Sequence, residues 1–431
     1  MNVNADLRLQ ETQSIFSDLS DFPEYQPRPK GARLPLEGIR IVDFTHFIAG
    51  PLATTILADM GADVVKVEAP GKGDDFRQYP PFNEDLGSGP PFIWTNRNKR
   101  SISLDLKSPG GQKLALQLIA KADVVVENFS TGVMDRLGLG YEVCKKGNPK
   151  LIYCSVSAYG REGAFADRGG FDPLAQAESG YISMNGYPDR EGVRSLSPVM
   201  DISTAMMTSN ALLGALLARD RCGTGQYVEV ALFDTAVMMT GYAPLQHLSG
   251  RDPIRTANTS PDTCPSGQLY ASDRGFMINC GNNQMFQRLM TQVVDLPEAA
   301  TEPRFSTNKN RLACREEIFA LLQAEFSKRP WDYWKGKLRE AGVPSGEIRT
   351  VGEAIRSPEA LERKVVTRVR HPKLGWVPNV ALPIRYSETP IKDPEFTPHV
   401  GEHTEAVLAD WLLYDESQLA AVIQSGACGS K

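Results

Sequence analysis

Asp201 is the residue whose position in this chain points most directly to chemistry. It follows the segment 194–200 and precedes a run of small and apolar residues, 202–219, that predicts a long helix. A carboxylate at a helix start accepts the free N–H groups of the first turn, and the helix dipole favours its ionised form. We therefore expect Asp201 to be the N-cap. An ionised carboxylate beside apolar and Gly-rich segments could also act as a covalent nucleophile. From this segment alone capping is the commoner role, so other residues must decide.

The composition of the chain excludes several other classes of function. Its 431 residues allow two or three domains, and a formal net charge of −5 argues against a protein that grips nucleic acid. No apolar run reaches the roughly 20 residues of a membrane helix, and the first 34 residues lack the apolar core of a signal peptide. Seven cysteines without a C-x-x-C pair indicate free thiols in a reducing, cytoplasmic compartment. Five histidines without metal-ligand spacing give no reason to expect a metal.

The elements that would position Asp201 alternate between short apolar strands and helices. The predicted strands of the first half are 39–44, 62–68, 101–106, 123–129, 151–157 and 227–232. Helices are predicted at 51–60, 108–121 and 202–219, the first two with a proline at the first helical position. Strands that alternate with helices form βαβ units around a mostly parallel sheet, so the predicted fold class is α/β. Ligands of such sheets bind at the carboxyl ends of the strands.

The chain is predicted to contain an N-terminal arm, a large domain and a smaller one. The predicted parts are an extended N-terminal extension at 1–34, the first part of a Rossmann-like large domain at 35–232, a linker at 233–257, a small α+β domain at 258–335, and a linker and return to the large domain at 336–431. The last helix is predicted at 404–413. The loop after the first strand lacks G-x-G-x-x-G, so NAD binding is not expected.

Several short motifs occur in an order that resembles one family. They are Val42-Asp43-Phe44, Ala49-Gly50-Pro51, Asn98-Lys99-Arg100-Ser101, Val126-Glu127-Asn128-Phe129, Gly169-Gly170-Phe171-Asp172 and Gly401-Glu402-His403-Thr404. Together they resemble the class III CoA-transferases, which include formyl-CoA transferase, the carnitine CoA-transferase and the related α-methylacyl-CoA racemases. The resemblance covers about residue 35 to the C-terminus. It implies a Rossmann-like large domain built from both ends of the chain, with the smaller domain inserted, and two such rings interlocked as a homodimer.

The resemblance also implies roles for particular residues. Asp201 matches the family's catalytic aspartate, which in the transferases attacks the thioester carbonyl of an acyl-CoA. Asp172 is either a second carboxylate that assists or only a cap of the helix after Phe171. The residues that match positions lining the family's CoA groove are His46, Ala49, Leu104, Lys107, Asn128, Phe129 and Arg136. On spacing alone, His46 is equally well a loop histidine bonded to backbone, and cations such as Lys107 are more often solvated surface charges.

Two departures from the family pattern bear on the substrate. Ile48 stands where formyl-CoA transferases carry a glutamine facing the acyl group, so formate and oxalate are not the expected pair. Racemases of the family use a histidine in a G-H-D block, and here that position is Phe171, which cannot accept a proton. We expect Ile48 and Phe171 to line the acyl pocket.

These residues together predict a CoA-transferase. We expect CoA to move from a short-chain or dicarboxylic acyl-CoA, such as succinyl-CoA, to a small organic acid through a covalent intermediate at Asp201. The CoA thioester is a substrate, and no bound cofactor, nucleic acid or membrane partner is expected. Two alternatives stay open: proton transfer of the α-methylacyl-CoA racemase type, and intramolecular transfer between the two carboxyls of one dicarboxylate.

Overall fold

The computed structural model describes residue 16 and residues 18–429, and these form two compact units. Unit 1 contains the described residues up to Ser179, the segment Ser195–Gly241 and the described residues from Ile355 onward. Unit 2 contains Gly180–Arg194 and Tyr242–Ala354. The small domain predicted at 258–335 therefore lies inside unit 2, which extends further in both directions.

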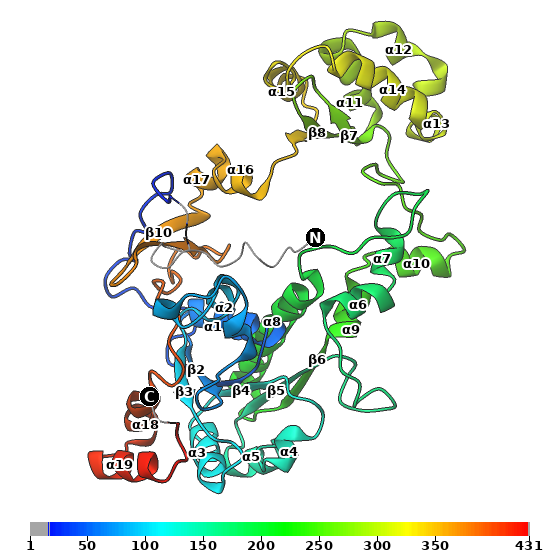
Figure 1. The fold of residues 1–431 in the computed structure, drawn as a ribbon. Helices are drawn as coiled ribbons and strands as arrows, with labels where there is room; N and C mark the ends of the chain where they lie inside the picture. Colours follow the sequence, from blue (N-terminus) through cyan, green and yellow to red (C-terminus); the bar gives the residue numbers. More distant parts are fainter. Residues whose placement is uncertain (1–15, 17, 430–431) are drawn as a thin grey trace, which may run out of the picture. The chain divides into compact units, whose positions relative to one another are not determined.

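Unit 1 is built on a parallel sheet that has six strands within the described residues (Figure 1). Its strands are β1 Arg40–Phe44, β2 Asp63–Glu68, β3 Arg100–Ser103, β4 Val124–Glu127, β5 Ile152–Ser157 and β6 Tyr227–Ala231. They lie in the order β3-β2-β1-β4-β5-β6, which is the order of the doubly wound Rossmann fold. The predicted α/β fold class is confirmed, and each predicted strand of this sheet is present.

Helices cover both faces of the sheet (Figure 1). The helices of unit 1 are α1 Ala49–Asp59, α2 Pro90–Asn96, α3 Pro109–Ile119, α4 Val133–Arg136, α5 Tyr141–Gly147, α6 Asp172–Glu178, α8 Val199–Cys222, α9 Leu232–Met238, α17 Pro358–Glu362, α18 Thr404–Leu412 and α19 Glu416–Gln424. Ile41 and Val124 share a buried cluster with residues of α1 and α8, whereas Val42 and Val125 share another with residues of α3 and α18. Burial on both faces explains why the strands read as continuous apolar runs.

The end of the chain differs from the prediction of a last helix at 404–413. A further helix, α19, follows it, because Asp415 and Gln418 form a reciprocal capping box that starts a new helix after Leu413. The chain then returns to the sheet, where the Asp105 amide donates to the carbonyl of Ala427 at 3.0 Å. An antiparallel bridge pairs Leu104 with Cys428, so the end of the described chain lies along the continuation of edge strand β3.

The described part of the N-terminal arm packs on a two-stranded hairpin of unit 1, β10 Val366–His371 and β11 Gly375–Val380. Leu19 and Phe22 are buried in one cluster with Val366. The Tyr25 amide donates to the Arg368 carbonyl at 3.0 Å, so the arm also bonds to the backbone of β10. Residues 1–15 and 17 of the predicted arm lie outside the described residues.

Unit 2 has its own small antiparallel sheet and its own core. Its elements include β7 Ser266–Tyr270, β8 Gly275–Asn279, β9 Ser345–Glu347, α7 Tyr181–Met184, α10 Ala243–Leu248, α11 Asn283–Arg288, α12 Pro297–Thr301, α13 Asn308–Ala313, α14 Arg315–Phe326 and α15 Trp331–Glu340. Phe276, Phe326 and Trp334 meet in that core with ring centroids 4.9–5.0 Å apart. The segment Gly180–Arg194 joins this unit because Arg255 donates to three of its backbone carbonyls.

Two buried ion pairs support the loop between β1 and α1. Lys99 Nζ lies 3.0 Å from Asp43 Oδ2, and Lys66 Nζ lies 3.0 Å from Asp74 Oδ2. Lys66 also donates to the Thr45 carbonyl at 2.6 Å, and Asp43 accepts from the Thr45 amide at 2.8 Å. Burial opposes the ionised form of Asp43, but the two lysines outweigh it and hold its pKa below the usual range. Burial lowers the pKa of Lys99 to about 8, and Asp43 opposes this shift. These buried charges therefore hold the first residue of the loop, Thr45, in place.

We predict that Lys99→Met destabilises the protein by about 3–5 kcal/mol, because it leaves the buried Asp43 carboxylate without the cation that contacts it. The pair Asp43→Asn with Lys99→Met removes both charges and should recover most of that loss. Urea unfolding of the three proteins measures both effects. A single variant within about 0.5 kcal/mol of the wild type would contradict this account of the network.

Candidate active site

A pocket lies at the carboxyl ends of the strands of unit 1, where the loops after β1 and β4 meet. These two strands are neighbours in the sheet, although β4 comes much later in the chain. Such a reversal of strand order leaves a crevice in which ligands of doubly wound sheets bind. The cavity has a volume of about 450 Å³ and is lined by His46, Phe47, Ile48, Ala49, Asp75, Asn128, Phe129, Ser130, Thr131, Val156, Ser157, Ala158, Arg161, Ala166, Asp167, Arg168, Gly169, Gly170, Phe171, Asp201 and Leu232.

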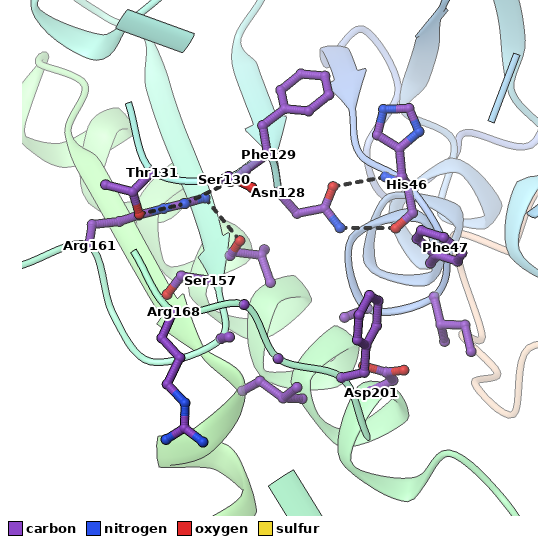
Figure 2. A pocket seen from close by; sticks show the side chains of 18 of the residues that line it. His46, Phe47, Asn128, Phe129, Ser130, Thr131, Ser157, Arg161, Arg168 and Asp201 are labelled. Atoms are coloured by element: carbon purple, nitrogen blue, oxygen red, sulfur yellow. Dashed lines mark hydrogen bonds between the residues drawn. The ribbon is translucent and has the colours of Figure 1, made fainter. Parts of the chain in front are cut away.

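One wall of the pocket joins the two loops by paired hydrogen bonds (Figure 2). The His46 amide donates to Asn128 Oδ1 at 2.8 Å, and Asn128 Nδ2 donates back to the His46 carbonyl at 2.9 Å. The His46 ring packs 5.2 Å from the Phe129 ring, and its Nδ1 lies 3.7 Å from Asp74 Oδ1. The structure thus brings together three of the residues predicted for the CoA groove: His46, Asn128 and Phe129. The His46 ring lies near a carboxylate, and its backbone is held by Asn128.

Asp201 lies in the pocket at the start of α8, but it is not the N-cap that the sequence predicted. The helix begins two residues earlier at Val199, and Pro198 precedes it. Asp172 supplies the missing acceptor: its Oδ2 accepts from the amides of Met200 at 2.7 Å and of Asp201 at 3.3 Å. The carboxylate of Asp201 is therefore not needed for capping. The pocket lining includes Asp201 but not the buried Asp172.

Asp172 also does not cap the helix that it opens. It is the first residue of α6, and Phe171 is the N-cap without a side-chain hydrogen bond. Asp172 Oδ1 instead accepts from Gln176 Nε2 at 2.5 Å, and Gln176 Oε1 accepts from the Ser195 amide at 2.8 Å. The alternative that Asp172 caps the helix after Phe171 is therefore wrong, because its oxygens bond elsewhere. Asp172 links α6 to the segment before α8.

The pKa of Asp201 is raised to about 7, first by burial and second by the nearby charge of Asp172. Burial disfavours the charged form of any carboxyl group, and a like charge adds to that effect. Burial and the Asp172 charge thus oppose the preference for the ionised form that a helix start gives to a carboxylate. A carboxyl group with a pKa near 7 stands at a value that functional carboxylates often have.

Aromatic rings also line the pocket. The Phe47 ring lies 5.9 Å from Phe171, edge to face, and 6.0 Å from the buried Phe76. Phe47 has a φ of 64°, a left-handed backbone that is strained for a bulky residue and is held here by the surrounding loop. Ile48 and Ala49 follow it in the pocket. The predicted acyl-pocket residues Ile48 and Phe171 therefore share one cavity with Asp201.

Three predicted CoA contacts do not line this pocket. Leu104 is buried in the core beneath α3, and Lys107 and Arg136 are exposed. Coenzyme A is much longer than its reactive end, so these three residues stay predictions for the rest of the CoA groove.

The sequence reasoning missed Arg161 and Arg168, which both line the pocket. Arg168 pairs with Glu178 and stacks on Tyr159, and in Figure 2 its guanidinium points away from His46. Arg161 donates hydrogen bonds to Glu127 at the end of β4 and to the carbonyl of Phe129 in the loop that follows. The signal that could have found Arg161 is its place directly after a predicted strand, at the edge where such sheets bind ligands.

The described residues contain no group of three or more His, Cys, Asp or Glu side chains placed to hold a metal ion. All seven cysteines lie in the described part of the chain, and each has a free thiol. Among the described helices, none has both the length and the apolar character that crossing a bilayer requires.

Comparison with known proteins identifies the family. The sequence pattern of CoA-transferase family III matches residues 36–404. The chain belongs to this family. The predicted resemblance is confirmed, and the pocket is that of a family III protein.

Relatives of known activity cover most of this family III chain. It is 38% identical to the acetyl-CoA:oxalate CoA-transferase of Acetobacter aceti, over 79% of this chain and 87% of that protein. It is 36% identical to the succinate–glutarate CoA-transferase of Agrobacterium fabrum, over 91% and 98%. The crystal structure of a CAIB/BAIF family protein from Brucella suis matches with a TM-score of 0.79 and 36% identity, over 88% of this chain and all of that one.

We predict that Asp201→Asn stabilises the protein at pH 8. The folded-state pKa of about 7 lies above the ordinary value of 3.8, so folding favours the protonated carboxyl group. The stability that this preference provides is present at acid pH and is lost as the pH rises from about 4 to about 7. Asparagine resembles the protonated acid, so its melting temperature should exceed the wild-type value by roughly 2–5 °C at pH 8.

The difference between the two proteins should shrink as the pH is lowered to 5, as followed by thermal unfolding. Asp172→Asn is the companion variant: it removes the neighbouring charge, so the wild-type loss of stability should move to lower pH. A constant difference between Asp201→Asn and wild type at every pH would show that the Asp201 pKa is not raised.

Proposed function

We propose that this protein transfers CoA from a short-chain or dicarboxylic acyl-CoA to a small organic acid through a covalent intermediate on Asp201. The observation that carries the proposal is the position of Asp201 in one pocket with His46, Ala49 and Asn128, in a chain of CoA-transferase family III. A carboxylate with a pKa of about 7 is ionised in a large fraction at neutral pH and is a better nucleophile than a strongly acidic one.

The proposed reaction exchanges one acyl bond for another of similar energy at every step. An Asp201 oxygen attacks the thioester carbonyl, the C–S bond breaks, and a mixed anhydride and the CoA thiolate form. The thiolate then attacks the aspartyl carbonyl and releases the donor acid, leaving an aspartyl-CoA thioester. The acceptor carboxylate displaces the thiolate to form a second anhydride. The thiolate finally attacks the acceptor's acyl carbonyl, which regenerates Asp201. No step needs a metal or a proton donor.

Phe171 favours transfer over racemisation. A two-base racemase needs a proton acceptor on each side of the α-carbon, and a phenyl ring is not one. Phe171 lines the pocket with Asp201 and lies 5.9 Å from Phe47, so this side of the cavity is apolar.

The identity of donor and acceptor is the finer part of the proposal. Succinate and glutarate occur in the name of the Agrobacterium relative, and oxalate in that of the Acetobacter relative. We propose a succinyl-CoA-like donor. Because Ile48 cannot supply an amide hydrogen bond, we place oxalate after the longer dicarboxylates as acceptor. Free thiols on all seven cysteines support a reducing, cytoplasmic compartment.

We predict that mass spectrometry after incubation with succinyl-CoA and trapping by hydroxylamine or borohydride finds the modification on Asp201. Asp201→Ala should abolish transfer to glutarate, oxalate and other acids, while CoA affinity stays within about threefold of the wild type. An acyl-CoA that gains deuterium at its α-carbon, with an unmodified protein, would instead indicate racemase chemistry. Transfer within one dicarboxylate would give no exchange with an added labelled acid. Substantial transfer by the Ala variant would refute the nucleophile assignment.

We also propose that the protein is a homodimer of interlocked chains. Large apolar side chains are exposed in the chain, among them Leu196, Met206 and Leu217 of unit 1 and Leu245, Leu248 and Ile254 of unit 2. Leu196 is 90% exposed and Leu248 is 80% exposed. An interface between two chains would remove such side chains from water, and the interlocked arrangement is the one that the family resemblance implies.

We predict that light scattering after gel filtration gives twice the 47.3 kDa chain mass, and that the mass does not fall on dilution. Interlocked chains cannot part without opening one ring, so dilution into the nanomolar range for hours should leave the dimer intact. A monomer of 47.3 kDa at micromolar concentration would contradict the proposal.

A further inference from the structure

Arg161 lines the candidate active site, yet its guanidinium has no donor left for a ligand. Its Nε donates to Ser155 Oγ at 2.6 Å. Its Nη1 donates to the Phe129 carbonyl at 2.7 Å and to Thr131 Oγ1 at 3.3 Å. Its Nη2 donates to Glu127 Oε1 and to the Val156 carbonyl, both at 3.1 Å. An arginine side chain has five N–H donors, and here each has an acceptor. A direct role in binding the substrate's carboxylate is therefore not what this geometry offers.

These bonds connect the carboxyl ends of three neighbouring strands. Glu127 is the last residue of β4, and Ser155 and Val156 belong to β5. The backbone amide of Arg161 adds a third strand, because it donates to Glu229 of β6 at 2.7 Å. The side chain is 13% exposed and pairs with a Glu127 side chain that is 7% exposed. The residue thus bridges β4, β5 and β6 at the edge that carries the pocket.

The bridge reaches the pocket wall through Phe129. The Phe129 carbonyl accepts from Arg161, and the Phe129 amide donates to Glu127 Oε2 at 2.9 Å, so both polar backbone groups of this residue depend on the ion pair. The Phe129 ring packs against the His46 ring, and the preceding residue, Asn128, holds the His46 backbone. A displacement of Phe129 would therefore move the wall shared by the loops after β1 and β4.

We infer that Arg161 is a positioning residue for CoA binding: together with Glu127 it fixes Asn128 and Phe129 and, through them, His46. The inference rests on the proposed function, since it takes CoA to occupy this pocket. Asp201 is held from another side, by Asp172, so loss of the bridge should affect binding of CoA more than the chemical step. The same bridge reaches the next loop, because Arg161 Nη1 donates to Thr131 Oγ1, which itself donates to the Ala166 carbonyl.

The inference can be tested by replacing Arg161 with methionine. Because Glu127 carries a charge, this change alone could weaken CoA binding through a loss of stability, so a second variant is needed. Burial raises the pKa of Glu127, and Arg161 is the cation that opposes this shift. Arg161→Met alone would leave a buried, unpaired carboxyl group and could lower stability for that reason. The double variant Glu127→Gln with Arg161→Met removes the charge and the bridge together. A loss of CoA binding that persists in the double variant is then due to the missing bridge.

Arg219 offers a matched control. Its side chain is 12% exposed, close to the 13% of Arg161, and pairs with Asp123 at 2.7 Å, so Arg219→Met removes an equally buried arginine from an ion pair in the same unit. Arg219 lies on α8 but does not line the pocket. Any effect of destabilisation alone should therefore occur in this variant too.

The experiment measures the dissociation constant of free CoA by calorimetry, kcat for transfer, and amide hydrogen exchange of residues 127–132 in the four full-length proteins. We expect Arg161→Met and the double variant to weaken CoA binding by about tenfold or more, with kcat within about threefold of wild type. Exchange in residues 127–132 should rise at least about tenfold in these two variants only. Arg219→Met should match the wild type in CoA binding and in exchange.

Two results would overturn the inference: wild-type CoA binding and exchange in both Arg161 variants, or an equal loss of CoA binding in Arg219→Met. If the wild type binds no CoA, the proposed function fails. The hydrogen-exchange data then show by themselves whether the bridge fixes residues 127–132, because they need no ligand.

Discussion

The arrangement of the site depends on one carboxylate, that of Asp172, and on the amides that it binds. The first turn of any α-helix has N–H groups without partners inside the helix, and a buried helix start needs an acceptor for them. Asp172 provides it for α8 from a segment 29 residues earlier in the chain. Asp201 is therefore free to face the cavity while its backbone is fixed. The same proximity places a second negative charge near it, so position and raised pKa have one origin.

The other walls of the cavity are held by ion pairs below them. The loop after β1 rests on four almost fully buried charged residues, Asp43, Lys66, Asp74 and Lys99. The loop after β4 rests in the same way on the ion pair of Glu127 and Arg161. Buried charges are costly unless each finds a partner, so such networks tolerate few alternative arrangements. The loops that they support can then carry residues in unfavourable conformations, such as Phe47 with its left-handed backbone.

Features with local causes could be predicted from the sequence, and features made by distant partners could not. The strands of unit 1 can be predicted from the sequence because burial on both faces gives apolar runs. The helix boundaries can be predicted because prolines and glycines mark where helices begin and end. The cap of α8 was assigned to Asp201 because it is the nearest acidic residue, whereas the true acceptor comes from the start of α6. Arg161 escaped notice because its partners lie on three strands that only the fold brings together. The extent of unit 2 could not be predicted either, because Gly180–Arg194 joins this unit through hydrogen bonds from Arg255, which lies far along the chain.

The end of the described chain lies beside the continuation of β3 and so affects how exposed this edge of the sheet is to other molecules. An edge strand of a sheet carries unpaired N–H and C=O groups that can pair with another chain, which is a common route to aggregation. Here the Asp105 amide, just beyond β3, is already paired with Ala427, and Ala427 and Cys428 are buried against the same cluster as Leu104. Ala427 and Cys428 lie beyond the part of the chain that the family pattern matches. Ala427 and Cys428 therefore occupy the position beside the continuation of β3 where the backbone of another chain could otherwise pair.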